Sequence, residues 1–261
     1  MTEFRPEMCV DAGQQGLMQW LLKRLKSKLA FDANKLYCSE ILAILLQDTL
    51  ENRELLGEIN GIDSLLQRLA GFKRHDPSNT EEIEMMENLF NCLCSALLLP
   101  SNRARFLKGE GVQLMNLMLR EKKLSRFSSL KVLDHAMTGE EGAENCNKFV
   151  EILGLRSIFP LFMKTHKKQK KKGGISEEDH EEHVCSIIAS MLKNCSAANK
   201  QRVINKFTES DHAKVDRLME LHFKYLTRVQ SVDDRIEKEK QVLFYLLHFT
   251  PWFVKSRKNN S

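Results

Sequence analysis

The segment Asn52-Arg-Glu-Leu-Leu-Gly-Glu-Ile-Asn-Gly61 decides the fold, because its pattern of an Asn followed nine residues later by a Gly occurs twice more in the chain. The other copies are Asn102-Arg-Ala-Arg-Phe-Leu-Lys-Gly-Glu-Gly111 and Asn145-Cys-Asn-Lys-Phe-Val-Glu-Ile-Leu-Gly154. An apolar helical stretch follows each final glycine, and another follows Gly16. These four glycines are 45, 50 and 43 residues apart. Because this period is typical of armadillo and HEAT repeats, the sequence predicts an all-α, right-handed superhelical solenoid.

The repeat pattern also predicts how the chain is divided. We expect armadillo-type repeats over residues 1–208, at about 7–50, 51–99, 100–143 and 144–197, with a partial repeat from 198. Residues 209–261 depart from the pattern and are expected to form an atypical helical cap that closes the open end. Only fifteen residues precede Gly16, too few for a full first helix. The chain therefore reads as the C-terminal part of a longer solenoid.

Capping patterns predict several helix starts. A serine followed three residues later by an acidic residue occurs at Ser78, Ser176 and Ser231, and each should begin a helix. The first would start the helix that ends near Pro100. The last would divide the C-terminal cap into two helices, the first of them over residues 211–230.

The composition fits a helical protein with its own core. Hydrophobic residues make up 42% of the 261 residues, only five residues are proline, and no useful apolar alternation predicts a strand. The longest apolar run, Ile41 to Leu46, is too short to span a membrane, so no membrane association is expected. The seven cysteines are an odd number, and most of them lie on apolar faces of expected helices, which favours reduced thiols in the nucleus or cytosol. The net charge of +5 comes largely from one loop, so it does not by itself argue for nucleic acid.

Three stretches of the chain resemble the beta-catenin-like family of nuclear armadillo proteins. They are Glu40–Ile62, Asn88–Cys94 and His248–Lys255, and the similarity runs over essentially the whole chain. The resemblance implies a nuclear scaffold associated with the spliceosome and with mRNA splicing and processing. It also implies binding to basic, nuclear-localisation-type peptides of splicing factors and to an activation-induced cytidine deaminase. Importin-type grooves hold such peptides with Trp and Asn one turn apart, an arrangement that neither Trp20 nor Trp252 provides.

Polar residues on the expected third helix of each repeat are the candidates for binding such peptides. Carboxylates would supply the charge that a Lys/Arg peptide needs, and amides could hold its backbone. The alternative is that each residue lies on a solvated outer face. The candidates are Glu84, Glu87, Asn88 and Asn91 on one helix, Asp134 in the following repeat, and Glu40 and Gln47 in the preceding one.

A charged segment, residues 166–182, interrupts the repeats, and we expect it to form a flexible loop between two helices. Its basic run has the shape of a monopartite nuclear import signal. The alternative is a solvated loop whose lysines pair loosely with the acidic residues that follow. The basic run consists of Lys167, Lys168, Lys170, Lys171 and Lys172.

No local motif predicts catalysis, a metal or a cofactor. His180-Glu-Glu-His183-Val-Cys185 lacks the spacing of a zinc site, and Cys92 and Cys94 point to different sides of a helix. A catalytic triad can be dispersed in sequence, so this is weak evidence against an enzyme. We therefore interpret the chain as a non-enzymatic nuclear scaffold, with self-association left open. The alternative is an RNA-binding component of a ribonucleoprotein, which would need a basic stripe with aromatic residues.

Overall fold

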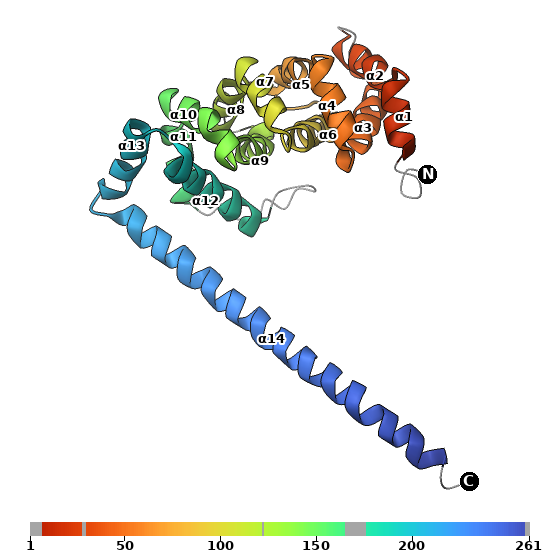
Figure 1. The fold of residues 1–261 in the computed structure, drawn as a ribbon. Helices are drawn as coiled ribbons and strands as arrows, with labels where there is room; N and C mark the ends of the chain where they lie inside the picture. The colour runs from red at the N-terminus through yellow and green to blue at the C-terminus, as the bar shows by residue number, and fades with distance from the viewer. Residues whose placement is uncertain (1–6, 28–29, 122, 165–175, 259–261) are drawn as a thin grey trace. The chain divides into compact units, whose positions relative to one another are not determined.

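The computed structural model describes residues 7–27, 30–121, 123–164 and 176–258, and within these ranges it contains helices and no strand (Figure 1). The predicted all-α fold is therefore confirmed. The chain divides into two compact units, residues 1–206 and 207–261. The basic run from Lys167 to Lys172 lies outside the described residues. The rest of the expected charged loop, from residue 176 onward, belongs to a helix and its cap.

The first unit is built from successive groups of three helices. The groups are α1 (Glu7–Gln14), α2 (Leu17–Lys26) and α3 (Ala33–Gln47); α4 (Leu50–Glu58), α5 (Gly61–Leu69) and α6 (Thr80–Ala96); α7 (Pro100–Lys108), α8 (Gly111–Arg120) and α9 (Ser125–Met137); and α10 (Ala143–Glu151), α11 (Leu155–Phe162) and α12 (Glu177–Asn194). Two short 3-10 turns connect helices: η2 (Ala70–Phe72) lies between α5 and α6, and η3 (Glu140–Gly142) lies between α9 and α10. After α12, α13 (Ala197–Thr208) begins a further group.

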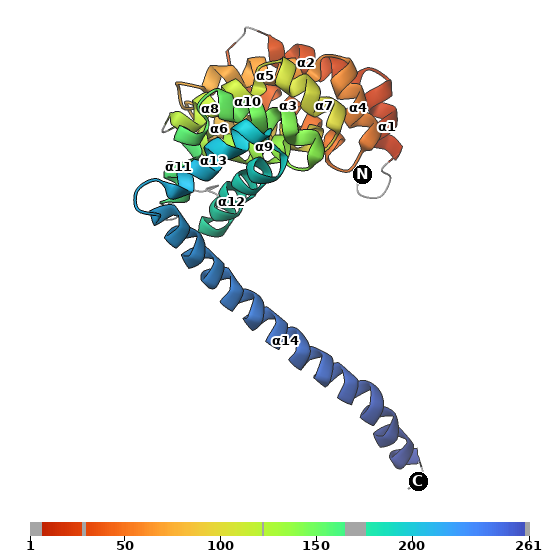
Figure 2. The same ribbon diagram turned by 60° about the vertical axis from the view of Figure 1, so that its left-hand side comes forward.

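Equivalent helices of successive groups stack into rows. The first helices α1, α4, α7 and α10 contact one another in order, and so do the third helices α3, α6, α9 and α12 (Figures 1 and 2). Because α6 packs against α3 on one side and α9 on the other, apolar side chains such as Leu89 and Phe90 are buried around much of its circumference. The stacking is that of a helical solenoid.

The repeating asparagines hold successive groups together. Asn102 is fully buried, and its Nδ2 donates to the Ala96 carbonyl at the end of α6 (3.0 Å) and to the Arg53 carbonyl of α4 (2.9 Å). Asn52 makes the same pair of bonds one group earlier, to carbonyls of α3 (2.9 Å) and α1 (2.8 Å). Asn145 reaches a carbonyl of α7 at 3.5 Å. Each asparagine thus satisfies a carbonyl of the first helix in the preceding group, and the first two also satisfy one near the end of a third helix.

The residue after each of the first two asparagines adds to this link. Arg53 Nε donates to the Leu46 carbonyl and Arg103 Nε to the Leu97 carbonyl, both at 2.8 Å. The Asn-Arg pair therefore caps two consecutive carbonyls near the C-terminus of the preceding third helix. Where the pair becomes Asn-Cys, the Cys146 thiol takes over and lies 3.4 Å from a carbonyl of α9.

The glycines that end each motif are packing glycines, and they do not adopt a left-handed conformation. A Cβ atom on Gly111 would lie 2.3 Å from a ring carbon of Phe106, and Gly61 and Gly154 are equally close to their own preceding helices. The left-handed residue is the one before each glycine, with φ between 58° and 65°. These residues are Asn60, Glu110 and Leu153.

The three predicted capping boxes have different outcomes. Ser176 caps α12 in a full capping box with Asp179, as predicted. The helix expected from Ser78 is instead capped by Asn79, whose side chain accepts the backbone N–H of Glu82. Ser231 caps nothing, because it lies inside α14.

The second unit consists mainly of α14 (Ala213–Lys258), one continuous helix of 46 residues. The prediction of two helices here was wrong. Neither glycine nor proline occurs between Ala213 and Thr250, so nothing in the sequence forces a break. The capping role of residues 209–261 stays a prediction. Among the described residues, none of the helices combines the length and apolar character that a membrane crossing requires.

Candidate functional site

The candidate residues all lie on the third-helix row, but they divide into two kinds. Glu87 and Asn88 lie between neighbouring helices. Ser128 Oγ of α9 donates to the Glu87 carboxylate of α6, at 3.0 and 2.8 Å to its two oxygens. Asn88 Nδ2 lies 3.3 Å from Ser39 Oγ of α3. These two side chains therefore join α6 to both of its neighbours.

Burial sets the electrostatics of Glu87. It raises the pKa of this carboxyl, while the hydrogen bond from Ser128 and the nearby charge of Lys131 act in the opposite direction. A carboxylate that is enclosed and already hydrogen-bonded offers little to a ligand. We therefore assign Glu87 a role in packing α6 against α9.

Asp134 makes the equivalent link between α9 and α12. Its Oδ1 accepts from Ser186 Oγ at 2.5 Å, and its Oδ2 lies 2.8 Å from His183 Nδ1. The cluster contains the three residue types of a hydrolase triad, yet the serine and the histidine both contact the carboxylate. A catalytic serine would instead face the other nitrogen of the histidine. The cluster holds two helices together, and its geometry is not that of a triad.

The other candidates are exposed. Glu84 and Asn91 lie two turns apart on one side of α6, and Glu40 and Gln47 lie two turns apart on α3. None of the four side chains makes a hydrogen bond or an ion pair with another described residue. They remain accessible, and they belong to adjacent helices of the same row (Figure 1).

An apolar stripe beside Glu40 was missed by the sequence reasoning. Tyr37, Ile41 and Ile44 are exposed on α3 by 57%, 40% and 41%. At 100° per residue they share one side of the helix, and Glu40 and Gln47 lie along its edge. The i, i+4, i+7 spacing was visible in the sequence, but such a stripe ordinarily marks a buried face. Carboxylate, amide and apolar groups thus adjoin on α3.

Within the part of the chain that the structure describes, no three His, Cys, Asp or Glu side chains gather as metal ligands would. The seven cysteines are free thiols, and all but Cys185 are buried.

Comparison with known proteins places the chain in a family. A family model described as "Catenin-beta-like, Arm-motif containing nuclear" matches residues 1–245. Beta-catenin-like protein 1 of Rattus norvegicus is 71% identical over 240 residues, which are 92% of this chain and 42% of the relative. The Homo sapiens protein of the same name is 70% identical over the same shares. The homolog of Schizosaccharomyces pombe is 36% identical over 220 residues, 83% of this chain and 37% of the relative.

The chain therefore spans less than half the length of these relatives. The match nevertheless covers nearly all of this chain, including every helix of the solenoid unit. The armadillo motif in the family's description agrees with the stacked groups of three helices. The chain belongs to the catenin-beta-like family of nuclear, armadillo-motif proteins.

Proposed function

We propose that this chain is a non-enzymatic nuclear scaffold that binds basic segments of splicing factors within a spliceosome-associated complex. The observation that carries the proposal is the set of exposed groups on α3 and α6. Glu40 and Glu84 offer carboxylates, and Gln47 and Asn91 offer amides, on two helices that pack side by side. Lysine and arginine side chains pair with carboxylates, and amides bond a peptide backbone in both directions.

The bonds of Glu87, Asn88 and Asp134 narrow the proposal. These three side chains already join helices of the row, so the ligand contact falls to Glu40, Gln47, Glu84 and Asn91. The apolar stripe on α3 would accept an aliphatic side chain next to the basic one. A basic segment of a cytidine deaminase fits the same surface chemistry, and we include such a partner in the proposal.

The experiment is fluorescence anisotropy with two labelled probes, a Lys/Arg-rich nuclear-localisation peptide and a single-stranded RNA of similar length. Glu40→Lys combined with Glu84→Lys should abolish peptide binding, because two attractive charges become repulsive. Binding to the parent chain should weaken as salt rises. A matched variant, Glu51→Lys with Glu54→Lys on α4, reverses the same number of charges away from the third-helix row.

The outcomes separate the candidate functions. Loss of peptide binding only in the α3/α6 variant supports the proposal. Equal peptide affinity in the parent and that variant removes this surface from consideration. RNA binding by the parent without peptide binding would favour the ribonucleoprotein alternative, and the proposal would fall.

A further inference from the structure

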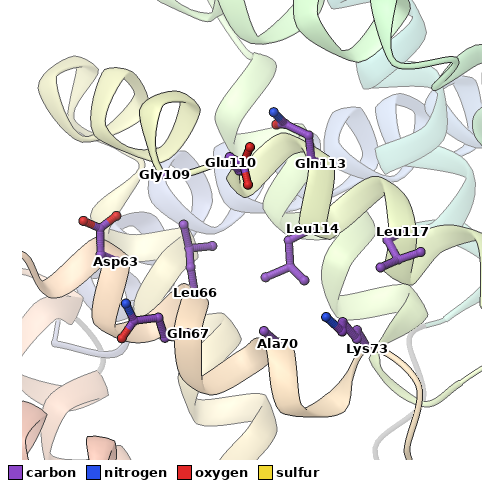
Figure 3. A pocket seen from close by; sticks show the side chains of 10 residues that line it. All are labelled: Asp63, Leu66, Gln67, Ala70, Lys73, Gly109, Glu110, Gln113, Leu114 and Leu117. Carbon is purple, nitrogen blue, oxygen red and sulfur yellow. The ribbon is translucent and has the colours of Figure 1, made fainter.

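A groove between the second helices α5 and α8 is separate from the third-helix row. Its volume is about 360 Å³, within the range of ligand sites, and it opens to solvent. Figure 3 shows Leu66 of α5 and Leu114 of α8 facing the space between the two helices, with Asp63 and Glu110 toward one end and Lys73 toward the other. The groove therefore has an apolar middle, an acidic end and a basic end.

The next pair of second helices, α8 and α11, differs from α5 and α8 at the positions of the two leucines. At the α5/α8 junction, Leu66 lies five residues after the repeat glycine Gly61, and Leu114 lies three residues after the next repeat glycine, Gly111. At the α8/α11 junction the same positions hold Asn116 and Ser157. There Ser157 Oγ donates to Asn116 Oδ1 (2.7 Å), and Asn116 Nδ2 donates to the backbone carbonyl of Ile152 in the turn between α10 and α11 (3.2 Å). A hydrogen-bonded pair of polar side chains at the α8/α11 junction is thus replaced by two leucines at the α5/α8 junction.

Gly109 opens the groove further. It lies two residues before its repeat glycine, a position occupied by Ile59 in the preceding group and Ile152 in the following one. The backbone does not require a glycine, because φ is −79° at Gly109, −86° at Ile59 and −83° at Ile152. A Cβ on Gly109 would instead lie 2.5 Å from Asp63 Oδ1. The glycine makes room at the mouth of the groove and lets the Asp63 carboxylate approach it.

We propose that the α5/α8 groove binds a peptide segment with one large apolar side chain and a lysine or arginine about one turn away. The apolar side chain would fill the space between Leu66 and Leu114, and the basic group would pair with Asp63 and Glu110. An acidic residue on the other side of the apolar anchor would face Lys73. The charges at the two ends fix the direction of the peptide. This site shares no residue with the proposed peptide surface on α3 and α6.

The test is selection of a phage-displayed random twelve-residue peptide library on the whole chain. We expect enriched peptides with an apolar residue near Lys or Arg. Their affinity, measured by fluorescence anisotropy, should fall at least about tenfold for Gly109→Ile, which adds the side chain that the neighbouring groups carry. Asp63→Lys, an exposed charge reversal that leaves the groove open, should give a similar loss. Glu84→Lys on α6 is the control and should leave the affinity of these peptides unchanged.

Each outcome decides the proposal. The ordinary φ of Gly109 and the exposed Asp63 side chain should allow Gly109→Ile to fold, which circular dichroism would verify; if it does not fold, Asp63→Lys carries the test. Peptides that bind the parent and lose affinity in the groove variants support the site. Failure to enrich such peptides, or equal affinity for the parent and Asp63→Lys, overturns it. Peptides sensitive only to Glu84→Lys would support the α3/α6 surface and refute the groove.

Discussion

Replacement of Asn102 by alanine tests how the armadillo groups are joined. The side chain is fully buried and makes three hydrogen bonds: to the carbonyls of Arg53 (2.9 Å) and Ala96 (3.0 Å), and from Arg105 Nη1 (3.0 Å). At about 1 kcal/mol net for each bond, Asn102→Ala should lower the free energy of unfolding by about 3 kcal/mol. For a unit of this size, that corresponds to a fall in Tm of about 6–12 °C.

The assay is thermal and urea unfolding followed by circular dichroism. Asn91→Ala is the matched control, because Asn91 lies exposed on α6 and its removal should change stability by less than about 0.5 kcal/mol. Asn102→Asp is a sharper variant. It keeps the shape but places a carboxylate oxygen where an N–H faced two carbonyls, so it should destabilise at neutral pH more than alanine does. If Asn102→Ala unfolds within about 0.5 kcal/mol of the parent, the asparagines do not join the groups in the way described.

Three further predictions concern packing and charge. Because burial raises the pKa of Glu87 above 4.5, its contribution to stability is present below that pH and is lost as the pH rises through the raised pKa. Glu87→Gln should therefore gain stability relative to the parent as the pH rises from below 4.5 through the raised pKa, measured by urea unfolding at a series of pH values; a difference that stays constant with pH would contradict this. Gly111→Val would overpack the Phe106 ring and should cost about 1–3 kcal/mol, whereas Gly71→Ala, in open space, should cost nothing measurable by thermal unfolding. Leu153→Asn should raise the unfolding free energy by up to about 1 kcal/mol in a urea titration, because Leu153 is half exposed with φ at 65°; a loss of stability would show that its side chain packs usefully.

Much of the fold could be predicted from the sequence, because each repeat is one supersecondary unit with its own signals. The Asn-to-Gly spacing marked the groups, and the capping pattern at Ser176 gave the start of α12. The role of the asparagine could not be predicted, since its partner carbonyls lie 43 and 49 residues away, at Cys9 for Asn52 and at Arg53 for Asn102. The break at Ser231 was wrong because a local serine and acid pair does not end a helix in a stretch that contains neither glycine nor proline.

The candidate site was predicted only in part. Helical spacing correctly placed Glu84, Glu87, Asn88 and Asn91 on one helix, but spacing cannot tell which side faces a neighbour. At 100° per residue, Glu84 and Asn91 lie only about 60° and 40° from Glu87 around the helix, and these small angles separate the enclosed Glu87 from the exposed pair. The neighbour that encloses Glu87 is Ser128, 41 residues away. Only the packing of successive third helices distinguishes a helix-joining carboxylate from one that is free to bind.

Photocrosslinking tests directly whether basic peptides bind across α3 and α6. A Lys/Arg-rich nuclear-localisation peptide carrying one benzophenone side chain would be crosslinked to the parent chain, and the attached residues would be identified by mass spectrometry. We expect crosslinks to α3 and α6 near Tyr37, Glu40, Glu84 and Asn91, and excess unlabelled peptide should suppress them. Crosslinks confined to other helices, or none that competitor peptide suppresses, would contradict this expectation.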